Sequence, residues 1–182
     1  MHTPDDVSPA LRQGDPRLLL EPVAQQLLAS AIPARMAYSA RDGSPRLVPS
    51  WFHWTGEELV MVTYLAGPGF VHAARRLTAL RADPRVAVSI DSEGFPPQAL
   101  SLRGEVMIDE VEEIAPEYAE AARRYLGRET AEQMLSDIDH PSLRQARISL
   151  NPRWVGLLDF DSRFPSAQGA VEPDGQLAEG AP

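Results

Sequence analysis

A glycine-containing turn followed by two adjacent arginines is the segment of this 182-residue chain best suited to chemistry. Gly67-Pro68-Gly69 precedes a helical run that contains Arg75 and Arg76. The first N–H groups of a helix attract anions, and a guanidinium can hold a phosphate through two parallel hydrogen bonds. The segment therefore predicts a phosphate site. The alternative is a plain loop followed by a solvated helix face.

A second candidate is the aromatic run Trp51-Phe52-His53-Trp54. Because side chains alternate along a strand, Trp51 and His53 share one face and Phe52 and Trp54 share the other. One aromatic pair can cover a flat ring. We expect Phe52 and Trp54 to pack in the core or at a subunit interface, and we consider His53 for a catalytic or cofactor-tuning role.

Residue types that the chain lacks exclude several classes of chemistry. There is no cysteine, so disulfides, thiolate nucleophiles and cysteine-ligated metal centres cannot form. All 17 basic residues are arginines, which excludes a pyridoxal phosphate Schiff base and a Walker-type phosphate loop. The histidines occur in no metal-binding motif, so we expect no metal site.

The charge and hydropathy of the chain limit its partners and location. The formal net charge is −9, so we expect no nucleic-acid partner, because phosphate backbones bind basic surfaces. No apolar run reaches the roughly 18 residues of a membrane span. The first residues lack the basic-then-apolar pattern of a secretion signal. We therefore expect a cytoplasmic protein without a membrane partner.

Hydrophobic periodicity predicts an α+β fold. Clear alternation over 99–108 indicates a half-buried strand, and Asp42-Gly43 indicates a hairpin turn. Strand-like runs cover 34–40, 45–54, 58–65, 85–91, 99–108, 144–150 and 153–160, and helices are predicted at 17–30, 114–126 and 130–138, besides the arginine-rich one. This order suits an antiparallel barrel of six to seven strands with peripheral helices. One domain is expected over 17–164, between a flexible N-terminal tail (1–16) and a disordered C-terminal tail (165–182).

Taken in order, several of these pieces resemble the pyridoxamine 5′-phosphate oxidase-like superfamily, the flavin-binding split barrels. The matching pieces are Asp42-Gly43, Val48-Pro49-Ser50-Trp51-Phe52, Thr63, Arg75-Arg76, Asp83-Pro84-Arg85-Val86 and Leu102-Arg103-Gly104-Glu105-Val106. The resemblance covers about residues 20–160. It implies a split β-barrel that forms a homodimer, with two flavin sites at the subunit interface.

The resemblance also implies a cofactor and the residues that bind it. The cofactor would be FMN or, in related branches, the deazaflavin coenzyme F-420, and it would exchange hydride with a small organic substrate. The implied cofactor-binding residues are Pro49, Ser50, Trp51 and Phe52 along the ring, Thr63 and Tyr64 at the ribityl chain or phosphate, and Arg75 and Arg76 at the phosphate. Candidates to contact substrate or the second subunit are His53, His72, Arg153 and Trp154.

Two departures from the family pattern leave alternatives open. The segment 65–73 lengthens the spacing between Thr63 and the arginines, and the C-terminal substrate-binding segment of true pyridoxamine-phosphate oxidases is missing. We therefore do not expect that particular reaction. Within the same fold, the alternatives are an F-420-dependent reductase, whose longer acidic tail would need basic groups such as Arg46, Arg81 and Arg103, and a non-catalytic flavin or haem binder with His53 or His72 as axial ligand.

Overall fold

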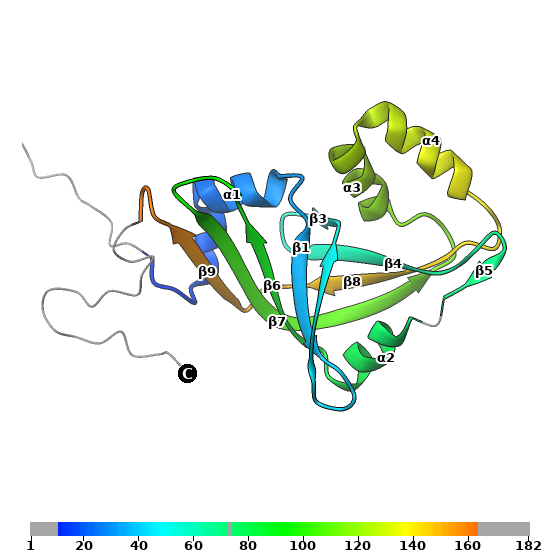
Figure 1. Cartoon of the computed structure of the whole chain (residues 1–182), viewed down its shortest axis with the longest axis horizontal. Coiled ribbons are helices and arrows are strands. Elements are labelled where there is room, and N and C mark those ends of the chain that lie inside the picture. Colours follow the sequence, from blue (N-terminus) through cyan, green and yellow to red (C-terminus); the bar gives the residue numbers. More distant parts are fainter. Residues whose placement is uncertain (1–10, 73, 164–182) are drawn as a thin grey trace, which may run out of the picture.

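The structure is a computed structural model that describes residues 11–163, apart from residue 73. Residues 1–10 and 165–182 of the two predicted tails lie outside the described residues. The described part has the predicted α+β architecture, in which four α-helices surround one curled antiparallel sheet (Figure 1).

The sheet is curled, and the chain joins its two end strands at a single corner. Its strands are β1 (Ala34–Ser39), β2 (Pro45–Ser50), β3 (Phe52–Trp54), β4 (Leu59–Gly67), β5 (Phe70–Val71), β6 (Arg85–Asp91), β7 (Gln98–Val111), β8 (Arg144–Leu150) and β9 (Trp154–Asp159). They lie in the order β2-β1-β6-β7-β8-β4-β3, with β5 beside β4 and β9 beside β7. The two end strands, β2 and β3, are separated by Trp51 alone. The predicted run 45–54 is thus two strands, and the two-residue β5 is a further addition to the predicted set.

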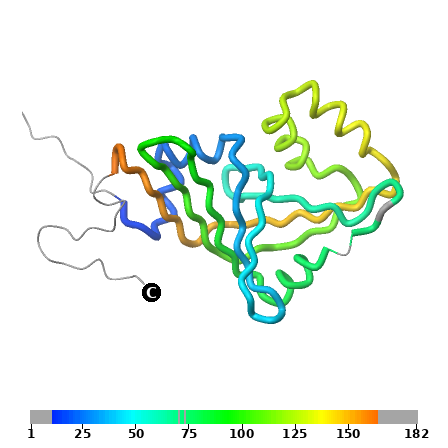
Figure 2. Tube along the Cα trace, viewed as in Figure 1, coloured from blue at the N-terminus to red at the C-terminus, as the bar shows by residue number. Residues whose placement is uncertain are grey.

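The corner at Trp51 leaves a gap in the barrel wall. Before it, β2 pairs with β1, and after it, β3 pairs with β4. No pairing joins β2 to β4 in the described chain. Pro49 lacks an N–H group and cannot donate to a strand ladder, which disfavours extending the β3–β4 ladder back along β2. The barrel is therefore split between β2 and β4, as the tube view lets the reader follow (Figure 2).

The helices lie around this barrel. They are a 3₁₀ turn (Pro16–Leu20), α1 (Pro22–Ala29), α2 (Arg75–Ala82), α3 (Pro116–Leu126) and α4 (Arg128–Ile138). The single helix predicted over 17–30 is divided, because Pro22 has no N–H to continue the preceding turn and instead begins α1. In Figure 1, α3 lies beside β3 and β4 and α4 lies next to α3, whereas α2 lies near the β1–β2 hairpin.

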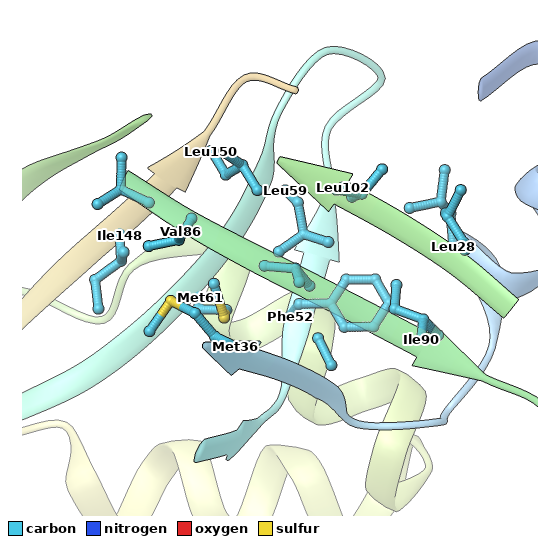
Figure 3. Packing of buried hydrophobic residues seen from close by; sticks show 14 of the residues in the cluster. Leu28, Met36, Phe52, Leu59, Met61, Val86, Ile90, Leu102, Ile148 and Leu150 are labelled. Atoms are coloured by element: carbon cyan, nitrogen blue, oxygen red, sulfur yellow. The ribbon is translucent and has the colours of Figure 1, made fainter. Parts of the chain in front are cut away.

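The barrel interior is a packed hydrophobic core. Phe52, Leu59, Met61 and Leu102 are completely buried and point into it (Figure 3). The alternation predicted over 99–108 is confirmed, since Leu100, Leu102 and Val106 are buried. Burial of Phe52 also confirms its expected place in the core.

Residues just before the 3₁₀ turn are tied to β9. The side-chain amide of Gln13 donates to the carbonyl of Leu157 at 2.7 Å and accepts from the N–H of Leu157 at 2.8 Å. The N–H of Gly14 donates to the carbonyl of Val155 at 2.8 Å. Ordered contacts therefore begin before the predicted tail boundary at residue 16.

One ion pair fastens α3 to the outer face of the sheet. Arg147 on β8 donates to Glu117 on α3 through two hydrogen bonds, of 3.0 Å from Nε and 2.5 Å from Nη2. The two side chains are only 24% and 14% exposed, so solvent screens the pair weakly. Hydrogen bonds from Arg147, opposed by burial, hold the pKa of Glu117 below its usual value of 4.5.

We expect Glu117→Gln to lower the free energy of unfolding by about 1–3 kcal/mol at pH 7, because a charge-assisted hydrogen-bonded pair is lost. The carboxyl pKa is lower in the folded state than in the unfolded state, so its contribution is complete above about pH 4.5 and is lost as the pH falls through the lowered value. Urea unfolding from pH 7 to pH 2.5 measures the difference. Glu120→Gln, which removes an exposed partner of Arg123 on the same helix, is the control and should cost under about 0.5 kcal/mol. A pH-independent difference for Glu117→Gln would contradict this account.

Candidate functional site

A cavity of about 330 Å³ opens at the gap between β2 and β4 and will be called the inner cavity. Its lining comes from β1, β2, β4, the start of α2 and the segment before it: Tyr38, Val48, Thr63, His72, Ala74 and Arg76. The lining contains no aspartate or glutamate, although the chain carries a net charge of −9. The inner cavity is therefore locally suited to an anion.

Arg76 is the charged group of the inner cavity. It is half-buried, and it forms no hydrogen bond or ion pair with the described residues. Burial lowers the pKa of its guanidinium, and the nearby Tyr38 acts in the opposite direction. Arginine nevertheless stays protonated in proteins, so the cavity contains a partly desolvated positive charge without a counterion. The other arginines whose side chains form no hydrogen bond, ion pair or ring contact in the described chain are all exposed: Arg12, Arg41, Arg75 and Arg128.

The start of α2 adds further donors beside Arg76. Ala74, which lines the inner cavity, precedes the helix with φ of 40°, a left-handed conformation that is uncommon for a residue with a Cβ. No side chain caps this end, and the first turn contains no acidic residue. The first N–H groups of α2 and the positive end of its dipole are therefore not neutralised by a local side chain.

The structure separates the two arginines that the sequence predicts as a pair. Arg76 and Thr63 both line the inner cavity, so these predicted residues are brought together. Arg75 is exposed and does not line the inner cavity. His72 is exposed at the rim of the inner cavity and also lines the adjoining cavity described below.

Tyr38 is a cavity residue that sequence reasoning missed. It follows Ala34 and Met36 in the alternating pattern of β1, and both of those residues are completely buried. The same alternation places Tyr38 on the inward face, at the end of the strand. The alternation could have identified Tyr38, because an inward-pointing polar aromatic residue near the end of a barrel strand lies at the mouth of the barrel.

The predicted ring-binding residues mostly lie on the other side of the barrel wall. Ser50 and Trp51 line a pocket of about 150 Å³ beneath α3. The Trp51 ring stacks on Tyr125 of α3, with centroids 5.1 Å apart and planes 9° apart. Pro49 is exposed, whereas Phe52 is 0% exposed. The Phe52 side chain therefore lacks surface with which to line a ring, because the barrel core takes it instead.

Tyr64 is likewise directed away from Thr63, since successive strand residues face opposite sides. Its ring meets Tyr118 of α3 edge-on, at 5.5 Å between centroids and 86° between planes. Burial is the main cause that raises the pKa of the Tyr64 hydroxyl well above its usual value. Tyr64 thus packs under α3 and does not line the inner cavity.

His53 belongs to a separate cavity of about 300 Å³ between α1, β3 and α3. The lining includes Glu120 and Arg124. Burial, followed by the charge of Arg124, lowers the pKa of His53 below its usual 6.5, while Glu120 and Glu117 oppose the shift. His53 is therefore mainly uncharged at pH 7, and it is not brought together with Arg76.

Arg153 and Trp154 do not approach the inner cavity. Trp154 begins β9, and the Arg103 guanidinium lies 3.8 Å from the centroid of its ring. Arg153 is exposed and lies 4.0 Å from Glu105. In Figure 1, β9 is at the opposite end of the molecule from β5. Both candidates contact residues of their own chain and lie far from the predicted phosphate site.

Residues 11–163, apart from residue 73, contain no cluster of three or more His, Cys, Asp or Glu that could hold a metal ion. In the same part of the chain, no helix combines the length and the apolar character that crossing a membrane requires.

Comparison with known proteins gives matches in structure but not in sequence. No family model matches the chain, and no curated protein matches its sequence. A solved F420 reductase superposes with a TM-score of 0.55 at 23% identity, covering 72% of this chain and 94% of the other. A putative pyridoxamine 5′-phosphate oxidase from Listeria innocua gives 0.51 at 16% identity, covering 74% and 94%. A heme binding protein from Mycobacterium smegmatis gives 0.52 at 18% identity, covering 78% of this chain and 54% of that one.

These matches are to proteins whose names include a reductase, a putative oxidase and a haem binder, so the shared feature is the architecture. The curled antiparallel sheet that closes at Trp51 and the helices around it agree with that likeness. The chain has the split-barrel fold of the pyridoxamine 5′-phosphate oxidase-like proteins.

Proposed function

We propose that the chain is an FMN-dependent oxidoreductase that holds the phosphate of its cofactor in the inner cavity and acts on a small organic substrate. The observation that carries the proposal is Arg76, a half-buried cation that has no counterion in the part of the chain that the structure describes and that lines a cavity without carboxylates. A bound phosphate satisfies such a group, because it supplies the missing negative charge and accepts two hydrogen bonds.

The rest of the cavity lining is chemically consistent with that role. The hydroxyls of Thr63 and Tyr38 are neutral donors, and the N–H groups at the start of α2 are directed by an uncapped helix end. Backbone amides between Ser50 and Phe52 are the expected partners of the polar edge of the ring. At about 330 Å³ the inner cavity is near the lower limit of ligand sites, so it suits the anionic end of a nucleotide better than the whole molecule.

When bound, FMN supplies hydride transfer at its N5 atom, so the chain need only bind, orient and desolvate the reactants. This division of labour agrees with the histidine positions in the described chain. His53, His72 and His140 share no cavity with one another, and the described residues contain no metal-binding cluster.

F-420 and haem are the alternative ligands. The arginines considered for binding an acidic tail already have partners within the protein: Arg46 lies 3.7 Å from Asp42, Arg81 pairs with Glu110, and Arg103 lies over Trp154. This arrangement favours FMN over F-420. For haem, the feature to test is His72, which lines two adjoining cavities. An absorbance spectrum of the purified protein distinguishes the ligands, since a Soret band indicates haem and a flavin spectrum that bleaches with reductant indicates an oxidoreductase.

We expect Arg76→Ala to weaken FMN binding by about 10- to 150-fold, because one charge-assisted contact worth about 1.5–3 kcal/mol is removed. Fluorescence titration of FMN measures the dissociation constant. Arg75→Ala is the matched control, since it removes an equal charge from the neighbouring position, which is exposed, and it should change the affinity by less than about threefold. Equal losses in the two variants would assign the effect to general charge and not to the inner cavity.

We also propose that the active form is a homodimer. The inner cavity opens at the unpaired edge of β2, where Leu47 is 64% exposed and Pro49 is exposed as well. A second copy covering this edge would enclose the part of the cofactor that a small, open cavity leaves in solvent. Pro45 and Pro49 lack N–H groups, so we expect the contact to be made by side chains and not by strand pairing.

Light scattering should therefore give a mass of about 40 kDa, twice the 20.0 kDa of one chain. We expect Leu47→Glu to shift the protein toward the monomer, because it places a charge in the apolar contact. Leu20→Glu changes a leucine near α1 that is more exposed still, at 78%, and should leave the mass unchanged. A monomer in the unmodified protein, with FMN bound at full occupancy, would contradict the dimer while leaving the cofactor assignment intact.

A further inference from the structure

We infer that Glu110 makes this site selective for a cofactor that ends at its phosphate, and disfavours one whose phosphate continues into an acidic tail. The inference rests on the proposed function, because it assumes that the inner cavity holds the phosphate. It concerns a different cavity and depends on Glu110, to which the family resemblance assigns no role.

A second cavity, of about 410 Å³, adjoins the inner cavity and will be called the tail cavity. The two share His72 and Ala74 in their linings. The two cavities are therefore neighbours, and a group attached to a phosphate beside Arg76 would extend toward the tail cavity. The lining is partly apolar, from Leu65, Val71 and Leu77, and its charged members are Arg81, Glu110 and Arg144.

The sheet register places Glu110 in line with the predicted phosphate contact Thr63. Thr63 on β4 pairs with Ala146 on β8, and Ala146 pairs with Glu110 on β7. Residues directly opposite each other share a sheet face, so all three positions belong to the inward row. Two strand spacings separate Thr63 from Glu110, which is about 9.5 Å between their backbones. The carboxylate is therefore close enough to meet a short extension of the ligand, but not the phosphate itself.

Both cations of the tail cavity already have acidic partners. Glu110 accepts a hydrogen bond from Arg81 of α2, and it also lines the cavity itself. The Nε atom of Arg144 lies 3.3 Å from Glu112, and its Nη1 atom donates to the carbonyl of Leu143 at 2.7 Å. Arg76 has no such partner among residues 11–163, apart from residue 73. An acidic tail would thus leave a cavity with an uncompensated cation and enter one where the cations are neutralised.

The Arg81–Glu110 pair is exposed enough to be altered without unfolding the protein, at 52% and 55% side-chain exposure. In Glu110→Gln, Arg81 becomes an unneutralised cation in the tail cavity. A single charge about 4 Å from an anion contributes about 1 kcal/mol in water, or roughly fivefold in affinity. We therefore expect the affinity for F-420 to rise about fivefold and the affinity for FMN to change by less than about twofold.

Fluorescence titrations with FMN and with F-420 test this on the unmodified chain and on three variants. Glu105→Gln is the charge-matched control, because Glu105 faces Arg153 at 4.0 Å and lines neither cavity, so it should leave both affinities unchanged. In Glu110→Gln/Arg81→Ala the gain in F-420 affinity should disappear, because the cation responsible for it is removed.

The outcomes separate this inference from the proposed function. If the unmodified chain binds neither cofactor, the proposed function fails and the inference fails with it. If FMN binds but Glu110→Gln leaves the ratio of the two affinities unchanged, selectivity by Glu110 is wrong while the proposed function stands. Tighter binding of F-420 than of FMN by the unmodified chain would also overturn the inference.

Discussion

The structure depends on a corner at Trp51, where the chain stops pairing with β1 and begins to pair with β4. Up to Ser50 the chain pairs with β1, and from Phe52 it pairs with β4. Such a corner forgoes ladder hydrogen bonds, so packing on both sides must hold it. Phe52 is buried inside the barrel, Trp51 stacks on Tyr125 outside it, and Arg124 donates to the carbonyl of Phe52. The gap that results between β2 and β4 is where the inner cavity opens, so the packing at the corner and the candidate site have one structural cause.

Although the chain as a whole is acidic, the inner cavity at this gap is locally positive. Many of its arginines are used in surface pairs, such as Arg85 with Asp83 at 2.8 Å, which contribute little to stability because solvent screens them. Arg76 is different because it is half-buried and its cavity contains no carboxylate. Its desolvation is unfavourable without a partner, and nothing in the described chain compensates it. A cation kept in this way is better explained by a ligand than by the stability of the fold.

The sequence predicted the strands well and also three residues of the inner cavity, Thr63, His72 and Arg76. It did not predict which of the other candidate residues the fold keeps away from them, for a physical reason. Alternation over 99–108 and the Asp42-Gly43 turn report local periodicity, and both depend on neighbours in the chain. The division at Trp51 depends on which strand each half pairs with, and hence on distant residues. The directions of Arg75 and Arg76 follow from the way α2 begins after the left-handed Ala74, which a sequence pattern does not reveal. Trp51 and Tyr64 lie under α3 because Tyr118 and Tyr125 pack on them, a contact across more than 50 residues.

The strand register sets the relative positions of Thr63, which we propose as a phosphate contact, and Glu110, which we propose as the residue that selects the cofactor. Because strand side chains alternate with a period of two, the inward row that includes Met61 in the core reaches the barrel mouth at Thr63. The pairing of β4, β8 and β7 then extends the row at Thr63 across the mouth to Glu110. A one-residue slip of β7 would turn Glu110 outward and present Asp109 or Val111 to the cavity. The relative placement of the Thr63 hydroxyl and the Glu110 carboxylate is therefore set by the ladder that closes the core. Under the proposed function, a change of cofactor preference would require changes at these mouth positions while the core residues stay in place.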